Sequence, residues 1–198
     1  PPVVVVVALG WLSTVEVEMP EVFVEEQIIE LRDRFYDVAI PDDKTIWAVG
    51  KNGKIVRSDD RGSTFVVQQT PTIVHLQSIA AIDALTAVVV GNDGTTLNTR
   101  DGGKNWQRVA APLGDIGNKI FRVEQSPDGV LWATAEFGSV LFSDDLGSSW
   151  TRVGGDADVA WNDVAFAGSR VCITGEFGGL SCSDDQGVSW QEKDSQVD

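Results

Sequence analysis

Basic side chains are scarce in this 198-residue sequence. It has 15 Lys and Arg residues against 30 Asp and Glu residues, so its formal net charge is −15 at pH 7. Binding to polyanions depends on clustered Lys and Arg, and here these residues are scattered along the chain. The charge balance therefore argues against nucleic acid or an anionic membrane surface as a partner.

Histidine and tyrosine are almost absent, with His75 and Tyr36 as the single examples. A Ser-His-Asp triad would have to be built on His75, which we interpret as a packing or pore-mouth residue before a strand. The acidic pairs in the sequence, such as Asp144-Asp145, lack the alternating Asp/Asn pattern of an EF-hand loop. The sequence thus indicates no catalytic set and no metal site, and we expect no cofactor.

Long apolar runs are missing too, since a membrane-spanning helix needs roughly 20 apolar residues. The N-terminal stretch "PPVVVVVALGWL" is shorter, and it is either a buried strand or the remnant of a signal peptide or membrane anchor. Residues 25–35, "EEQIIELRDRF", predict a short helix with Ile28, Ile29 and Leu31 near one face. We treat residues 1–34 as an N-terminal segment distinct from residues 35–198.

What the sequence does have is a repeat. The octapeptides "SDDRGSTF", "TRDGGKNW", "SDDLGSSW" and "SDDQGVSW" share a hydroxyl residue, an aspartate, a glycine and a final aromatic residue. They recur at intervals of about 40 residues, which is typical of a repeat architecture built from one supersecondary unit. The shared positions are Ser58, Asp60, Gly62 and Phe65; Thr99, Asp101, Gly103 and Trp106; Ser143, Asp145, Gly147 and Trp150; Ser183, Asp185, Gly187 and Trp190.

Each unit contains four short stretches that favour strands by their length, their β-branched content and their flanking Gly, Pro and Asp residues. Four strands per unit of this length indicate a propeller blade. The sequence therefore predicts an all-β propeller of four-stranded antiparallel blades, at about residues 35–71, 74–112, 119–155 and 160–194. Either four blades close alone, residues 14–24 add a strand, or the chain is part of a larger propeller.

The second and third strands of each unit are joined by "GKNGK", "GNDGT", "AEFGS" or "GEFGG". Each fits a three-residue hairpin loop with a left-handed glycine. This loop sets four cross-strand pairs: Trp47 opposite Arg57, Val88 opposite Asn98, Trp132 opposite Phe142, and Cys172 opposite Cys182. The two cysteines are then either disulfide-bonded or a pair of buried free thiols.

The octapeptide lies where the chain reverses between the third and fourth strands. Its hydroxyl and carboxylate groups can accept hydrogen bonds from backbone N–H groups in the turn. Its glycine adopts a conformation that residues with a Cβ avoid, and its aromatic residue buries a large apolar surface. We interpret the motif as a structural device that performs no chemistry.

These residues resemble the Asp-box, or bacterial neuraminidase repeat, with the pattern S-x-D-x-G-x-x-W. The fuller unit, including "WAVGKNGKIVRSDDRGSTF", is most similar to the photosystem II stability and assembly factor family and its relatives in non-photosynthetic bacteria. The resemblance covers about residues 35–193. It implies a β-propeller that binds protein, although that family has seven blades and four repeats are visible here.

Aligned inner strands place Asp37, Arg122 and Asp163 in one column with Ser78, and place Tyr36, Phe121 and Asn162 in the preceding column with Gln77. Such a mixed polar and aromatic ring is suited to protein recognition, and a hydrated idle channel would show it as well. The candidate binding residues are therefore Tyr36, Asp37, Phe121, Arg122, Asn162 and Asp163.

The resemblance implies a non-enzymatic assembly, stability or accessory factor whose partner is a subunit of a membrane protein complex. It also implies a periplasmic, lumenal or extracellular location, with membrane contact through the partner or an anchored N-terminus. The alternative is a glycan-binding or sialidase-like propeller, which the Asp-boxes alone support. Sialidases use a Tyr nucleophile with a Glu and an arginine cluster, and this sequence shows no such set, so we expect no enzymatic activity.

Overall fold

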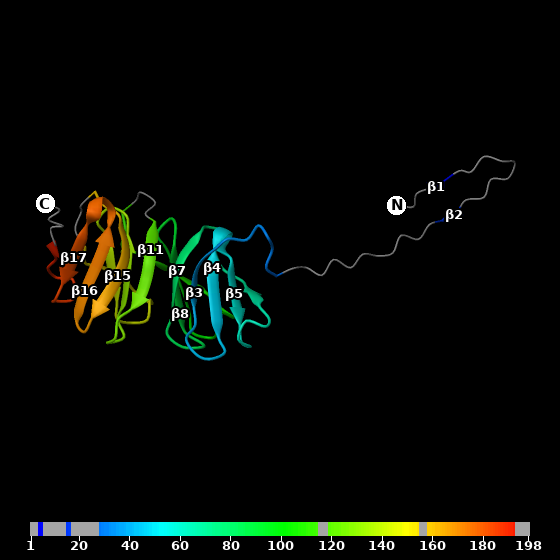
Figure 1. Cartoon of the computed structure of the whole chain (residues 1–198), viewed down its shortest axis with the longest axis horizontal. Coiled ribbons are helices and arrows are strands. Elements are labelled where there is room, and N and C mark those ends of the chain that lie inside the picture. The colour runs from blue at the N-terminus through cyan, green and yellow to red at the C-terminus, as the bar shows by residue number, and fades with distance from the viewer. Residues whose placement is uncertain (1–3, 6–14, 17–27, 115–118, 155–157, 193–198) are drawn as a thin grey trace.

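The computed structural model describes residues 4–5, 15–16, 28–114, 119–154 and 158–192. Within these ranges the chain forms four antiparallel sheets of four strands each, which confirms the predicted all-β propeller architecture (Figure 1). Each sheet is one blade, formed by consecutive strands. Blade 1 contains β3 (Phe35–Ala39), β4 (Ile46–Gly50), β5 (Ile55–Ser58) and β6 (Val66–Gln68); blade 2 contains β7 (Leu76–Ala81), β8 (Ala87–Gly91), β9 (Thr95–Thr99) and β10 (Gln107–Ala110). Blade 3 contains β11 (Ile120–Gln125), β12 (Leu131–Ala135), β13 (Val140–Ser143) and β14 (Thr151–Arg152); blade 4 contains β15 (Trp161–Ala167), β16 (Arg170–Gly175), β17 (Leu180–Ser183) and β18 (Gln191–Glu192).

The central hairpin of each blade has the predicted register. Trp47 pairs with Arg57, Val88 with Asn98, Trp132 with Phe142, and Cys172 with Cys182. The expected loop was wrong in one respect, because two consecutive residues are left-handed and not the glycine alone: Asn52 has φ 59° and Gly53 has φ 72°. This is a two-residue type I′ turn, whose twist matches that of the flanking strands. In blades 1 and 4 the turn falls within the short 3₁₀ elements η1 (Lys51–Gly53) and η2 (Glu176–Gly178).

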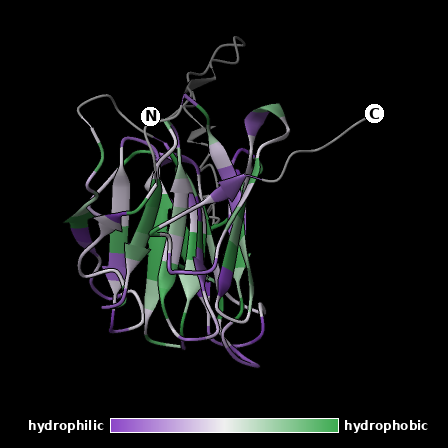
Figure 2. Ribbon diagram, turned by 90° about the vertical axis from the view of Figure 1, so that its left-hand side faces the viewer, coloured by the Kyte–Doolittle hydropathy of each residue, from purple (hydrophilic) through white to green (hydrophobic). Residues whose placement is uncertain are grey.

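The blades pack face to face and follow one another across the molecule in chain order (Figure 1). We call the face that contacts the next blade the front face and the opposite one the rear face. Trp47, Val49 and Ile55 on the front face of blade 1 pack with Ala87, Val89, Leu97 and Trp106 on the rear face of blade 2. Equivalent apolar clusters join blades 2 and 3 and blades 3 and 4. The hydrophobic core is therefore divided into layers between sheets, and Figure 2 shows hydrophobic residues concentrated in the strands.

Burial along the strands shows which blades lie at the ends of the array. Every residue of β8, β9 and β12 is buried, because blades 2 and 3 are covered on both faces. Burial alternates along β4 and β16, because blades 1 and 4 are each covered on one face. The first and last blades do not meet to close a ring. The expectation that four blades might close alone is therefore wrong for this structure.

The N-terminal segment differs from the prediction where it is described. Val4–Val5 (β1) pairs with Val15–Glu16 (β2), so neither strand joins a blade. The helix expected over residues 25–35 is not formed in residues 28–34, and residues 25–27 lie outside the described ranges. Instead the carboxylate of Asp33 accepts hydrogen bonds from the backbone N–H of Glu30 (2.8 Å) and from Lys54 Nζ, which fastens a turn to blade 1. One amphipathic turn is too short to stabilise a helix without a surface to pack against. The other residues of the apolar N-terminal stretch also lie outside the described ranges.

Candidate functional site

The four Asp-boxes occupy equivalent outer corners, each between the third and fourth strands of a blade. In blade 1 the buried Ser58 Oγ accepts a hydrogen bond from the N–H of Gly62 (2.8 Å) and donates one to Asp60 Oδ1 (2.7 Å). The Asp60 carboxylate also accepts from the N–H (2.8 Å) and the hydroxyl (2.7 Å) of Thr64. The same two backbone bonds, to the hydroxyl oxygen and to the carboxylate, recur in blades 2, 3 and 4.

These bonds make the Asp-box carboxylates acidic. Hydrogen bonds from the Thr64 hydroxyl and backbone lower the pKa of Asp60 from its usual 3.8 to about 2. Ser189 plays the same role for Asp185, whose pKa is also lowered to about 2. A hydrogen bond to the ionised form favours that form, so these groups stay charged at any physiological pH. These carboxylates therefore stabilise the turn by accepting hydrogen bonds from its backbone and side chains.

The Asp-boxes of blades 2, 3 and 4 also join each of these blades to the one before it. A Cβ on Gly103 would lie 2.9 Å from the Trp47 ring, and one on Gly147 would lie 2.9 Å from Val88. Arg57 Nη1 donates to the carbonyl of Gly102, and Asn98 Nδ2 donates to that of Gly147 (2.9 Å). The cross-strand pair on the front face of a blade, Trp47–Arg57 or Val88–Asn98, therefore contacts the Asp-box turn of the next blade.

The inner strands bring the predicted polar column together. Each inner strand has a bulge between its first and third residues. The third residue is the one that belongs to the predicted column: Asp37, Ser78, Arg122 and Asp163. Asp37 Oδ2 accepts hydrogen bonds from Ser78 Oγ (2.7 Å) and from the N–H of Ile79 (3.0 Å). Ser78 Oγ in turn accepts from the N–H of Val123 (3.2 Å), so one chain of hydrogen bonds connects blades 1, 2 and 3.

Arg122 is the centre of this column. Its guanidinium lies 3.5 Å from Asp37 in blade 1 and 3.5 Å from Asp163 in blade 4, and it also forms an ion pair with Glu124. Partial burial opposes the charge of Arg122, but the carboxylates of Glu124 and Asp37 outweigh it, so its pKa is raised. We call Asp37, Arg122, Glu124 and Asp163 the axial cluster. It carries three acidic groups against one basic group, so it is suited to binding a polar or cationic group.

Exposed aromatic side chains lie at the end of the molecule where the inner strands begin. Tyr36 is 43% exposed and lies 6.2 Å from His75, measured between ring centroids. Lys119 Nζ lies 4.6 Å from the centroid of Phe121. The tips of the β12–β13 and β16–β17 hairpins approach the same end, because Glu136 and Glu176 donate backbone hydrogen bonds to Lys119 and Ala160. We define the rim as four of the aromatic residues at this end: Tyr36, Phe121, Phe137 and Phe177.

Sequence reasoning missed Phe137, Phe177 and Glu124. Phe137 is 42% exposed and Phe177 is 93% exposed, and both have positive φ (55° and 56°). A bulky residue with positive φ is an unusual choice where the equivalent turns have Asn52 and Asp93. That departure from the Asn-Gly and Asp-Gly pattern was the available signal. Asn162 is exposed at its bulge, and its binding role, like that of the other predicted site residues, stays a prediction.

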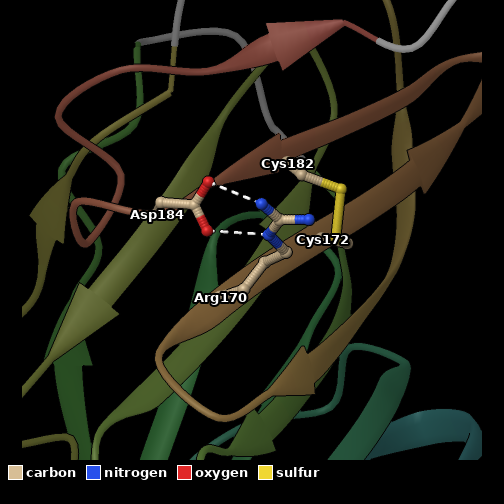
Figure 3. Close-up of a disulfide and its surroundings, with 4 residues drawn as sticks. All are labelled: Arg170, Cys172, Cys182 and Asp184. Carbon is tan, nitrogen blue, oxygen red and sulfur yellow. Dashed lines mark hydrogen bonds and ion pairs between the residues drawn. A yellow bond between two sulfur atoms is a disulfide. The ribbon is translucent and has the colours of Figure 1, made fainter.

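In the structure Cys172 and Cys182 are joined by a disulfide, which is the first of the two alternatives given by the sequence. Beside it, Arg170 at the start of β16 and Asp184 directly after β17 form a bidentate ion pair, at 2.7 and 2.8 Å (Figure 3). Both links lie on the front face of blade 4. This face is therefore cross-linked at the positions where blades 1 and 3 have a Trp paired with Arg57 or Phe142 and blade 2 has Val88 paired with Asn98.

The described part of the chain has neither the features of a metal site nor those of a membrane-spanning helix. No group of three or more His, Cys, Asp or Glu residues there is arranged to hold a metal ion. None of the helices in those ranges has the length and apolar character needed to cross a membrane.

The chain resembles solved propellers at low sequence identity. A structure described as YCF48 from Cyanidioschyzon merolae is 16% identical, with a TM-score of 0.61 over 83% of this chain and 57% of that one. A GH74 xyloglucanase from Xanthomonas campestris is 17% identical, with a TM-score of 0.63 over 83% of this chain and 31% of that one. A structure described as YCF48 bound to D1 peptide is 22% identical, with a TM-score of 0.40 over 81% of this chain and 66% of that one. The chain thus spans about three fifths of the length of the YCF48 structures that it matches.

No curated protein sequence matches this chain significantly. The sequence profile of the family described as photosynthesis system II assembly factor YCF48 matches residues 66–193, which include three of the four Asp-boxes. This match covers more than half of the chain, and it agrees with the blade architecture described above. The protein therefore belongs to the photosynthesis system II assembly factor YCF48 family.

Proposed function

We propose that the protein is a non-enzymatic, protein-binding propeller that helps to assemble or stabilise a membrane protein complex. Its family membership supports the assembly role. The disulfide supports a periplasmic, lumenal or extracellular location, because such bonds persist in oxidising compartments. The 4-blade scaffold itself would be a rigid platform for a partner.

The rim and the axial cluster are the proposed docking site for that partner. The observation that carries this proposal is the exposure of Phe177, at 93%, together with Tyr36, at 43%, around a column of paired charges. Aromatic anchors surrounded by polar groups are typical of protein-recognition surfaces. The excess of acidic groups in the cluster and in the whole chain suits a partner segment that carries apolar and basic side chains.

The experiment is capture of the partner from detergent-solubilised native membranes on the immobilised protein, with mass spectrometry of the eluate. We expect wild type to retain subunits of one membrane complex and the double variant Tyr36→Ala/Phe177→Ala to retain at least tenfold less. Val188→Ala is the matched control, because Val188 is 86% exposed and lies in an Asp-box at the opposite end of blade 4. Equal capture by the double variant would contradict the docking site.

A glycan array and a hydrolase screen test the glycan alternative with the same protein. The assembly role predicts no signal in either assay. A defined oligosaccharide bound or cleaved, with no membrane subunit captured, would overturn the proposed function.

A further inference from the structure

His75, the single histidine of the chain, links two blades at the end of the molecule where the rim lies. It lies directly before β7 in blade 2, and its carbonyl accepts a hydrogen bond from the N–H of Asn92 (2.9 Å) in the same blade. Its ring reaches the preceding blade, where Nδ1 accepts a hydrogen bond from the N–H of Asn52 (3.2 Å). The same ring lies 6.2 Å from that of Tyr36, measured between centroids. His75 therefore contacts both the tip of the β4–β5 hairpin and the rim.

The direction of the hydrogen bond from Asn52 fixes the charge of the ring. An N–H group donates only to a ring nitrogen that carries no proton, so Nε2 carries the proton of the ring and the ring is neutral. When a second proton binds at Nδ1, the two groups are both donors and the hydrogen bond is lost. Histidine ordinarily changes its charge between about pH 5 and pH 8, which is the range in which this bond would break.

The contact between the hairpin tip of blade 3 and the entry to blade 4 does not depend on such a group. There the N–H of Gly138 donates to the carbonyl of Val159 (2.7 Å), and both groups belong to the backbone. The tip of blade 1 has one contact without a titratable group, from Thr70 Oγ1 to the carbonyl of Gly53 (2.9 Å), in addition to the contact with His75. Loss of the histidine contact therefore releases one side of the tip and leaves Gly53 fixed.

Other charged and titratable residues lie on the elements that contact His75. They are Arg34 before β3, Tyr36 on β3, Lys51 and Lys54 beside the tip of the β4–β5 hairpin, and Asp93 at the tip of the β8–β9 hairpin. Lys54 is paired with Asp33. Arg, Lys, Asp and Tyr side chains ordinarily keep their charge between about pH 5 and pH 8. Lys51 directly precedes Asn52, so its positive charge repels a protonated ring at the tip.

We propose that His75 is a pH-sensitive switch between the hairpin tip of blade 1 and the rim. The neutral ring holds the tip through the N–H of Asn52. The protonated ring loses this bond, and as a cation it is attracted to the neighbouring ring of Tyr36. Protonation of histidine acts on interfaces in other proteins by such local changes. The effect on partner docking rests on the proposed function, because Tyr36 belongs to the rim, whereas the switch itself does not.

NMR spectroscopy of the isotope-labelled 198-residue chain tests the switch in the absence of any partner. In a titration from about pH 8 to pH 5, we expect the amide signal of Asn52 and the ring signals of Tyr36 and His75 to shift with a common midpoint. Phe177 is the internal control, because it has the tip position of Asn52 in blade 4, and its amide signal should not follow that midpoint. An Asn52 amide signal that stays constant while the His75 ring titrates would overturn the proposal.

Two variants separate the hydrogen bond from the charge. His75→Asn places an amide oxygen near the position of Nδ1, so the Asn52 amide signal should keep its high-pH position throughout the titration. His75→Phe keeps a ring beside Tyr36 and removes the acceptor, so the same signal should stay near its low-pH position. Because His75 is only half-buried, both variants should remain folded, which circular dichroism checks. An Asn52 signal that still titrates in either variant would assign the effect to another group and overturn the proposal.

Docking is measured separately, by repeating the capture from native membranes at both ends of the pH range. We expect wild type to retain roughly fivefold less partner at about pH 5 than at about pH 8, which is the effect of losing one hydrogen bond. His75→Asn should retain equal amounts at both. Capture by wild type that does not change with pH would overturn the regulatory role. No capture at any pH would contradict the proposed function and leave the NMR result to decide the switch.

Discussion

Gly103 is under two constraints that can be separated by experiment. Its φ is 81°, and a Cβ there would lie 2.9 Å from Trp47 and 2.3 Å from the side chain of Gln68. Gly129 has a similar φ of 91° but nothing within 4 Å of its Cβ position. The first constraint is backbone strain, which the two glycines share, and the second is contact between blades.

We therefore predict that Gly129→Ala lowers the free energy of unfolding by about 1 kcal/mol, for its left-handed backbone alone. Gly103→Ala should cost roughly 1–3 kcal/mol more, because it also overpacks the interface with blade 1. Urea denaturation of both variants measures the difference. Equal losses for the two variants would show that the Asp-box glycine serves its own turn and not the neighbouring blade.

The Asp-box carboxylates make stability depend on pH. The pKa of Asp60 and that of Asp185 are lowered from 3.8 to about 2 in the folded protein, so their contribution to stability is complete above pH 3.8 and is lost as the pH falls toward 2. We predict that Asp60→Asn/Asp185→Asn is less stable than wild type at neutral pH and loses less stability between pH 4 and pH 2. Urea midpoints across this range test it, and parallel curves would contradict it.

Residue roles in the Asp-box could be predicted from the sequence because the motif carries its own hydrogen-bonding logic. The residue directly before the glycine of each Asp-box also has a positive φ, and this could not be predicted. That position holds Arg61, Gly102, Leu146 or Gln186, which share no chemical property. The axial cluster was predicted in part. Asp37, Arg122 and Asp163 follow from strand alignment. Glu124 does not, because its role depends on how Arg122 is oriented.

At the scale of elements, hairpins were predictable because a short turn fixes the register of both strands. The segment before β3 was not, because the ion pair between Asp33 and Lys54 joins residues 21 positions apart. A local apolar pattern at Ile28 and Ile29 carries no information about that contact. Local periodicity therefore gave the wrong secondary structure for residues 28–34, where a distant contact holds the chain in a turn.

The disulfide closes a loop with a sequence separation of 10 residues on two strands that already pair. From loop-closure entropy we predict that its reduction lowers the free energy of unfolding by up to about 2–3 kcal/mol. Denaturation with and without dithiothreitol measures this change. The Cys172→Ala/Cys182→Ala variant is the control, and its stability should not change with dithiothreitol. An unchanged free energy of unfolding for fully reduced wild type would contradict the prediction.

At the scale of the whole molecule, the number of repeats was readable and their closure was not. Closure depends on the angle between successive blades, and that angle arises from packing at three interfaces whose members differ. For example, Trp47 and Trp132 occupy the same front-face position in blades 1 and 3, and the equivalent residue in blade 2 is the much smaller Val88. A motif that recurs in every blade cannot specify such differences.

The hydrogen bonds from Val123 to Ser78 and from Ser78 to Asp37 have a consequence for how the protein comes apart. Arrays whose repeats touch only their neighbours can fray one unit at a time from an end. Here the first blade supplies a carboxylate on which groups of both the second and the third depend. Peeling away the first blade leaves Ser78 and Arg122 without that acceptor, so the first three blades should melt as one cooperative block.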